Sequence, residues 1–371
     1  MKSKHIYKSI ACGVLLALTA TSCDLDYNPV DSYSDVTEGV DKTDEKPIFN
    51  SVQDVETSMV TLHKKFRDQQ EHWYVDKLLI GDAHSDNAYA GTTGAEVVPY
   101  ETNSIEGSNS VLKRDWDRFL GDIAEANRII VGCEQLKALS DSERGKYQSQ
   151  AKIFRAMVMF DMVRLWGNFP VITTVGGDIT EDNVEEMYPT YFPPQNTAEE
   201  AYAQIEKDLT EAVENPNTPT NDASDKSILT KSVARAMLAK VYAEKPLRDY
   251  AKVIKYADEL AADGFDLVED FSDLWAYDTE KKDCRVRNTK EAILEAHFPP
   301  GSGNWCTWMF GRNLSNWDES FTWAKWITPS RDLIRLYEEQ GDTKRYNESV
   351  VWYECGWSNY YPCLLYTSPS P

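Results

Sequence analysis

Apolar residues recur at steps of three and four along the first 260 positions of this chain, and this spacing most constrains its fold. Such stripes run over residues 52–66, 112–133 and 202–212. Steps of three and four place side chains on one face of an α-helix. We therefore expect a mainly α-helical fold in which each helix buries one face.

The sequence also marks where several helices begin and end. Two segments open with a capping-box pattern, Ser140 with Glu143 and Thr197 with Glu200. The segment 151–166 is apolar nearly all round, which predicts a central, buried helix that ends at Gly167. An extended segment is expected over 169–175, followed by a Pro-rich connection to about residue 196.

The later helices favour an array of helical hairpins joined by long loops and a few short strands. The pair over 231–263 matches part of the tetratricopeptide pattern, but Lys255 and Asp258 stand where that pattern has an aromatic and a small residue. A generic antiparallel helical bundle explains the same stripes about as well.

The amino terminus has the three parts of an export signal. Residues 1–22 carry three lysines and no acid, then a short apolar run, then small residues directly before Cys23. This pattern predicts a lipoprotein signal peptide over 1–22, acylation of Cys23 and an acidic tether over 23–48. The alternative is an ordinary signal peptide cut near Ser22.

The charge balance excludes one class of partner. The 371 residues hold 39 Lys and Arg against 61 Asp and Glu, a formal net charge of −22. A body this acidic repels phosphate backbones, so we expect no nucleic-acid partner.

Catalytic and cofactor motifs are absent from the sequence. It contains no P-loop, dinucleotide-binding, nucleophile-elbow or zinc-protease pattern, and we expect no catalytic residue, cofactor or metal. Carboxylate pairs are inevitable among 61 acids and do not identify a hydrolase. His63 is expected at the edge of the first helix, and an acidic loop around Asp270, Asp273 and Asp278 lacks an EF-hand pattern.

Tryptophan is concentrated late in the chain, where eight of the 11 lie at or beyond Trp275. Sugar rings stack their C–H faces on flat aromatic side chains, while amides bond the hydroxyls at the ring edges. The stretch over 300–326 is therefore a candidate glycan platform, with Asn304, Trp305, Trp308 and Trp317 as candidate contacts. The alternative is a second core, which we expect for Trp323 and Trp326.

Several short motifs occur in one order from Cys23 to about Asn347. The chain resembles the SusD/RagB family of outer-membrane lipoproteins in its acidic start, in Gly81–Asn87, in Trp116–Asn127, in Gln150–Pro170 and in Gly341–Arg345. The resemblance implies stacked, tetratricopeptide-like helical hairpins over 49–361. It also adds Asn87, Tyr89 and Tyr100 as candidate ligand contacts, whereas Trp116, Asn127 and Arg155 lie in helix stripes and are expected to be architectural.

The resemblance implies a non-catalytic, surface-exposed protein anchored in the outer membrane by lipid on Cys23. Such a protein would bind an oligosaccharide and deliver it to a SusC-like, TonB-dependent barrel. The alternatives are a peptide ligand, a two-carboxylate hydrolase acting on the glycan, or a purely structural partner of the barrel. Residues 362–371 look like translated adaptor DNA, so the domain is expected to be incomplete at its carboxyl end.

Overall fold

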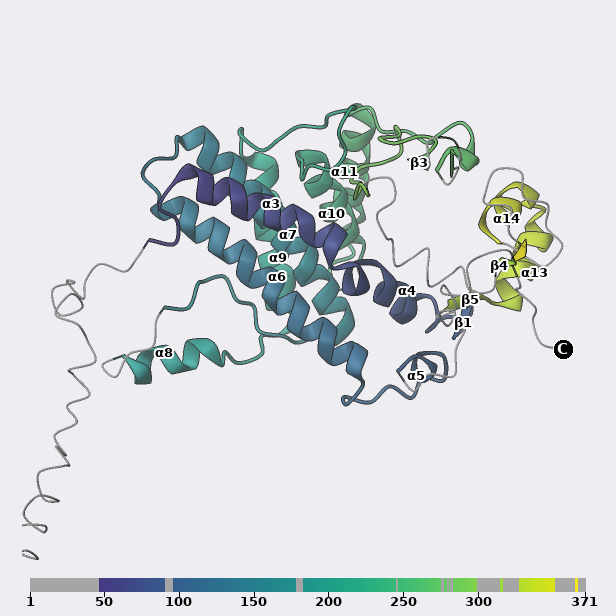
Figure 1. The fold of residues 1–371 in the computed structure, drawn as a ribbon, viewed down its shortest axis with the longest axis horizontal. Helices are drawn as coiled ribbons and strands as arrows, with labels where there is room; N and C mark the ends of the chain where they lie inside the picture. Colours follow the sequence, from purple (N-terminus) through teal and green to yellow (C-terminus); the bar gives the residue numbers. More distant parts are fainter. Residues whose placement is uncertain are drawn as a thin grey trace, which may run out of the picture. The chain divides into compact units, whose positions relative to one another are not determined.

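The computed structural model describes residues 47–90, 96–177, 183–244, 246–274, 277–278, 280, 283–298, 314–315, 327–350 and 364–365. The chain divides into two compact units, Met1–Pro47 and Ile48–Pro371, and every element described below belongs to the second. Helices prevail over strands in that unit, which confirms the mainly α-helical prediction (Figure 1).

The main helices are α3 (Val52–Asp68), α6 (Ser110–Gln135), α7 (Asp141–Trp166), α9 (Ala198–Glu214), α10 (Lys231–Ala243) and α11 (Tyr250–Ala262). Shorter helices are η2 (Glu71–Val75), α4 (Asp76–Gly81), α5 (Val98–Glu101), α8 (Val184–Tyr191), η3 (Phe271–Leu274), α13 (Arg331–Gln340) and α14 (Thr343–Ser349). The strands form antiparallel pairs, β1 (Ala88–Ala90) with β5 (Ile327–Pro329), β2 (Tyr277–Asp278) with β3 (Asp283–Cys284), and β4 (Leu314–Ser315) with β6 (Leu364–Leu365).

Long helices that follow one another in the chain pack against one another. Helix α6 packs on α7, α7 on α9, α9 on α10 and α10 on α11, while α3 lies against α6 and α7 (Figure 1). This neighbour-to-neighbour order is that of stacked helical hairpins. No described helix has both the length and the apolar character needed to span a membrane.

The helices α7 and α9 begin, and α7 ends, at the residues predicted from the sequence. Ser140 caps α7 and Thr197 caps α9, each in a reciprocal capping box with its glutamate. Gly167 follows α7 with a φ of 72°, a conformation that glycine adopts without a Cβ clash. These local signals therefore stop and start the helices that the apolar stripes predict.

Helix α7 is the centre of the main core. Its residues Ile153, Phe154, Met159 and Met162 have no exposed surface and pack among side chains from α3, α6, α9 and α10. Burial of each such side chain contributes about 1.5–3 kcal/mol. The prediction of a central, buried helix over 151–166 is confirmed.

A buried ionic network ties three elements to α7. The Arg155 guanidinium donates to both carboxylate oxygens of Asp208 on α9, at 2.8 and 2.7 Å, and to Asn127 Oδ1 on α6 at 2.7 Å. The Asn127 amide in turn donates to the carbonyls of Ile172 and Thr174, at 2.9 and 3.2 Å. Arg155 and Asn127 are therefore architectural, as predicted, and they fix the extended segment that follows α7.

Two elements differ from the sequence prediction. The Pro-rich connection contains the helix α8, because Met187 and Tyr191 pack over Gly176 and Gly177 despite the nearby prolines. The first apolar stripe continues past α3 into the π-helix η2, where His72 and Trp73 are buried. In both cases tertiary packing outweighs local propensity.

Candidate functional site

Two of the predicted ligand contacts, Asn87 and Tyr89, lie at a corner formed by β1 and β5. Tyr89 pairs in register with Thr328, and the Ser330 backbone N–H donates to the Asn87 carbonyl at 2.9 Å. Ser330 is also the N-cap of α13, and its hydroxyl donates to the Asp86 carbonyl. The corner thus joins residues more than 200 positions apart and holds them by backbone hydrogen bonds.

Both side chains of this corner face solvent. Tyr89 is 39% exposed, and its hydroxyl accepts a hydrogen bond from the Arg331 N–H at 3.4 Å, which fixes the ring direction. Asn87 is exposed, and no described residue bonds its side-chain amide. A fixed aromatic ring beside a free amide is the combination that stacks a sugar ring and bonds its hydroxyls.

Tyr100 lies beneath this corner and has no exposed surface. Its ring belongs to the small core of Leu79, Ala83, Val97 and Val111, and its hydroxyl donates to Asn109 Oδ1 at 3.4 Å. A side chain without accessible surface offers nothing to a ligand. Its packing gives Tyr100 a structural role, in contrast to the ligand contact that the resemblance implied.

The remaining predicted contacts, Asn304, Trp305, Trp308 and Trp317, lie outside the described residues, as does Cys23. In the sequence, however, the tryptophan-rich stretch ends directly before β5, whose first residue Ile327 pairs with Ala90. Chain connectivity therefore joins that stretch to the strand pair that carries Tyr89.

A pair of buried carboxyl groups lies next to the small core under the corner. Asp76 and Asp115 are 0% and 1% exposed, and the Arg114 guanidinium donates to Asp76. Burial, together with the charge of Asp76, raises the pKa of Asp115 to about 9. At neutral pH Asp115 is therefore protonated, and neither carboxyl group is accessible to a substrate.

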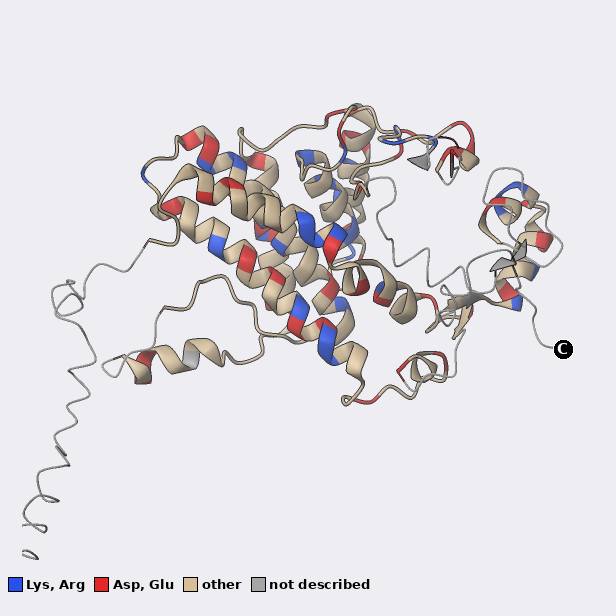
Figure 2. Cartoon of the chain, in the orientation of Figure 1, with Lys and Arg blue, Asp and Glu red and all other residues tan. Residues whose placement is uncertain are grey.

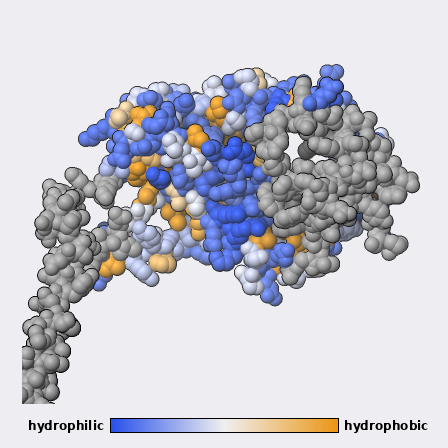
Figure 3. Space-filling view, viewed as in Figure 1, coloured by the Kyte–Doolittle hydropathy of each residue, from blue (hydrophilic) through white to orange (hydrophobic). Residues whose placement is uncertain are grey.

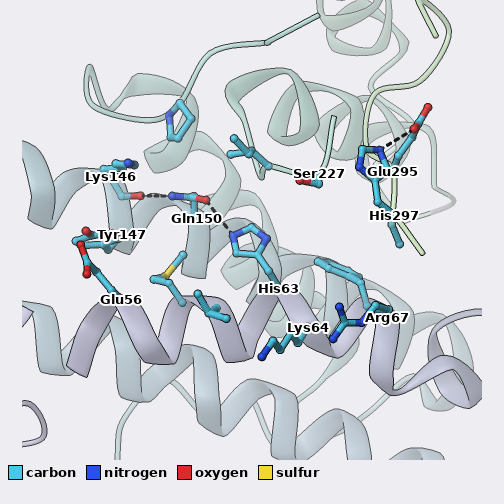
Figure 4. A pocket seen from close by; sticks show the side chains of 16 residues that line it. Glu56, His63, Lys64, Arg67, Lys146, Tyr147, Gln150, Ser227, Glu295 and His297 are labelled. Carbon is cyan, nitrogen blue, oxygen red and sulfur yellow. Dashed lines mark hydrogen bonds and ion pairs between the residues drawn. The ribbon is translucent and has the colours of Figure 1, made fainter. Parts of the chain in front are cut away.

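A groove that the sequence did not reveal lies between α3 and α7 (Figure 4). It has a volume of about 640 Å³, within the usual range for small-molecule sites, and segments near Pro219, Ser227 and Ala296 close its far side. Apolar residues of α3, Met59, Val60 and Phe66, line it together with Ile228. One sequence feature could have predicted this groove: the face of α3 that carries His63 and Lys64 beside these apolar side chains.

The polar groups of the groove mostly bond one another. His63 Nε2 lies 3.2 Å from Gln150 Oε1, while Gln150 Nε2 donates to the Lys146 carbonyl at 3.2 Å. Burial outweighs the bond to Gln150 and lowers the pKa of His63, so its ring is neutral at neutral pH. The Ser227 hydroxyl donates to the Asp225 carboxylate, whereas His63 Nε2 is paired with Gln150.

The acidic loop near Asp270 is neutralised by cations. Asp270 pairs with Lys344 at 3.1 Å, and Asp273 pairs with Arg285. The described residues include no group of three or more His, Cys, Asp or Glu side chains arranged to hold a metal ion.

Residues 31–243 match the model of the SusD-like family described as starch-binding and associating with the outer membrane. A curated SusD-like protein of Bacteroides ovatus is 25% identical over 318 residues, which cover 82% of this chain and 51% of that protein. This chain therefore spans about half the length of that relative.

Solved structures share the fold. A laminarin-binding SusD-like protein has a TM-score of 0.60 at 18% identity, over 81% of this chain and 66% of its own. Surface glycan-binding protein A from Bacteroides fluxus has a TM-score of 0.64 at 18% identity, with coverages of 83% and 66%. A structure with xylogluco-oligosaccharide has a TM-score of 0.58 at 23% identity, with coverages of 79% and 56%. Because the family model matches more than half of the residues and these structures share the helical array, the chain belongs to the SusD-like family.

Proposed function

We propose that this protein binds a neutral oligosaccharide at the corner formed by β1 and β5 and delivers it to a SusC-like, TonB-dependent barrel. The observation that carries the proposal is the exposed Tyr89 ring, which backbone pairing holds at a fixed position beside the free Asn87 amide. Three structurally similar proteins support the ligand class, since one binds laminarin, one is a surface glycan-binding protein and one was solved with xylogluco-oligosaccharide.

The tryptophans of the adjoining stretch complete this proposed site. Trp305, Trp308 and Trp317 supply further stacking faces, and Asn304 supplies a second amide, so that several consecutive sugar units are held. The net charge of −22 favours uncharged over anionic polysaccharides. Modest affinity suits this role, because a captured ligand must be released inward.

The proposal places the protein at the cell surface, with lipid on Cys23 as its anchor. Acylation supplies stable attachment to the outer membrane without a membrane-spanning helix. The family description, which names association with the outer membrane, supports this location. The role is non-catalytic, and the burial of Asp76 and Asp115 removes that carboxyl pair as the basis of a hydrolase.

Calorimetric titration with a panel of neutral oligosaccharides tests the binding role. We expect Tyr89→Ala to weaken binding about tenfold, equivalent to about 1.4 kcal/mol, and Tyr89→Phe to weaken it less because the ring is kept. Tyr250→Ala is the matched control, since Tyr250 on α11 is 59% exposed and remote from the corner in the sequence. We expect this control to bind as the wild type does.

Two results would contradict the proposal. The first is the absence of binding to every glycan of the panel, with binding to peptides instead or to nothing. The second is reducing-end release from a polysaccharide that one Asp or Glu substitution abolishes, which would indicate a hydrolase.

The proposed lipid anchor has its own test. Cys23→Ser is expected to move the protein from the membrane fraction to the soluble exported fraction.

A further inference from the structure

Helix α8 carries a row of large apolar side chains that face solvent. Val184, Tyr188 and Phe192 follow one another at steps of four, so they share one side of the helix and its immediate extension. Their exposed fractions are 42%, 55% and 66%. In the space-filling view, a few orange atoms lie among pale ones in the region where Figure 1 places α8 (Figure 3). We call these three residues the α8 stripe.

The neighbouring side of α8 holds the helix in place. The Tyr191 hydroxyl donates to the Gly177 carbonyl at 2.6 Å, and its ring lies over Gly176, where an added Cβ would come within 3.1 Å. Met187 covers Gly177 at a corresponding distance of 3.0 Å. Met187 and Tyr191, which is itself 48% exposed, anchor this side of α8 to the glycine pair, and the α8 stripe on the adjacent side is directed outward.

Two rings of the stripe form an aromatic surface. The centroids of Tyr188 and Phe192 lie 4.8 Å apart with an interplanar angle of 38°. The rings are therefore splayed and largely uncovered, and each presents a flat face. Such faces stack on the apolar C–H faces of sugar rings, as single small hydrophobic residues cannot.

The charges around the stripe define the ligand further. From Gly167 to Glu206 the sequence has no Lys or Arg, and the charged side chains that α8 contributes are Glu185 and Glu186 (Figure 2). At about 100° per residue, Glu185 lies at the edge of the stripe, about one turn before Tyr188 and two turns before Phe192. Its carboxylate can accept hydrogen bonds from hydroxyl groups, whereas anionic polymers and anionic lipids are repelled.

We propose that the α8 stripe is a second glycan-binding platform, at which Tyr188 and Phe192 stack against neutral sugar units and Glu185 accepts hydrogen bonds from their hydroxyls. The inference rests on the proposed function for its ligand class, but it concerns residues far in sequence from Tyr89. Two platforms on one chain would hold a long polysaccharide at two points. The second contact is then intramolecular, and avidity can exceed the affinity of either site by a factor of about 10²–10⁴.

Affinity electrophoresis of the full chain in gels that contain laminarin or xyloglucan tests this inference, alongside calorimetry with short oligosaccharides of the same polymers. We expect the double variant Tyr188→Ala/Phe192→Ala to lower the affinity for the retaining polymer at least tenfold. Its affinity for the short oligosaccharide should change less than twofold, because one platform suffices for that ligand. Tyr89→Ala should weaken both.

A matched control removes an equally exposed apolar pair elsewhere. Tyr250 and Ile254 lie four residues apart on α11 and are 59% and 63% exposed. Tyr250→Ala/Ile254→Ala is therefore expected to leave both measurements unchanged. Glu185→Gln should weaken polymer binding less than the ring deletions do, because it removes one acceptor and keeps the stacking surface.

The outcomes separate the two proposals. If the α8 double variant is retained by the polymer as strongly as the wild type while Tyr89→Ala is not, the second platform is wrong and the proposed function stands. If neither polymer nor any other neutral glycan retains the wild type, both fail. If the double variant keeps full glycan retention but loses association with a barrel protein, the stripe is a protein-docking surface, which also overturns the inference.

Discussion

Two of the buried clusters of charged side chains in the described part of the protein are built differently. In the Arg155 cluster, one arginine faces one carboxylate, Asp208, and one amide, Asn127. In the Asp76 cluster, two carboxyl groups, Asp76 and Asp115, share one arginine, Arg114, whose side chain is 32% exposed. The first cluster balances its charge with hydrogen bonds, whereas the second can do so only by keeping a proton.

The hydrogen bonds of the two clusters show the same contrast. Asp208 accepts two bonds from Arg155 and a third from Gln204 at 2.9 Å. In the Asp76 cluster, Asp76 Oδ1, Asp115 Oδ1 and Arg114 Nε are buried without a hydrogen-bond partner among the described residues. Although both clusters are buried, the Arg155 cluster is fully hydrogen-bonded and rigid, whereas the Asp76 cluster contains a carboxyl group that can titrate.

The largest predicted effect is the loss of the Arg155 cluster. Arg155→Met leaves the Asp208 carboxylate, which is 1% exposed, without its cation. We expect the free energy of unfolding to fall by about 3–5 kcal/mol, the usual cost of breaking a buried ion pair. Urea denaturation followed by circular dichroism measures this change.

The double variant Arg155→Met/Asp208→Leu is the control for that experiment. It removes both charges, so we expect it to recover much of the lost stability, since apolar side chains can replace a buried pair at little cost. If Arg155→Met lowered the free energy of unfolding by less than about 1 kcal/mol, water would reach Asp208. The two clusters would then not differ in the way described above.

Much of the fold could be predicted from the sequence because its signals are local. The capping boxes at Ser140 and Thr197 and the glycine after α7 depend on residues within one helical turn. The apolar character of residues 151–166 likewise predicted burial. Helix α8 was missed because its packing partners, Gly176 and Gly177, lie outside the helix. Three prolines, one inside the helix and two just after it, also argued against a helix.

The candidate site was only partly predictable for a related reason. Asn87 and Tyr89 came from a family resemblance, but the same resemblance did not show that Tyr100 is buried. Burial of Tyr100 depends on side chains from α4, α6 and the segment before α5, which no local pattern brings together. The groove beside His63 also combines helix faces and loops that are distant in sequence.

The second predicted effect concerns the Asp76 cluster and depends on pH. The pKa of Asp115 in the folded protein is about 9, against an ordinary value of 3.8. Between these values the folded protein keeps a proton that the unfolded chain releases. Stability from this group is therefore full below about pH 4 and is lost as pH rises toward 9, with a slope of at most about 1.4 kcal/mol per pH unit.

Asp115→Asn tests this slope, because asparagine stays neutral and has nearly the same shape. We expect unfolding free energies measured by urea from pH 5 to pH 8.5 to vary less steeply in the variant than in the wild type. The same substitution in the other cluster, Asp208→Asn, should instead lower stability throughout this range. Parallel curves for the wild type and Asp115→Asn would mean that Asp115 is ionised in the folded protein.

The smallest predicted effect comes from an ion pair on the same helix as Asp115 that is not buried. Lys113 Nζ lies 2.6 Å from Asp117 Oδ2, a shorter contact than the Arg155 bonds, yet the two side chains are 73% and 59% exposed. Water screens such a pair, so Lys113→Gln should cost only about 0.3–0.5 kcal/mol, and the difference should vanish in 1 M NaCl. Urea unfolding at low and high salt measures it, with Arg155→Met as the reference whose cost should persist in salt. If Lys113→Gln cost as much as Arg155→Met, distance rather than burial would set the strength of these pairs, and the two clusters would owe their difference to something other than desolvation.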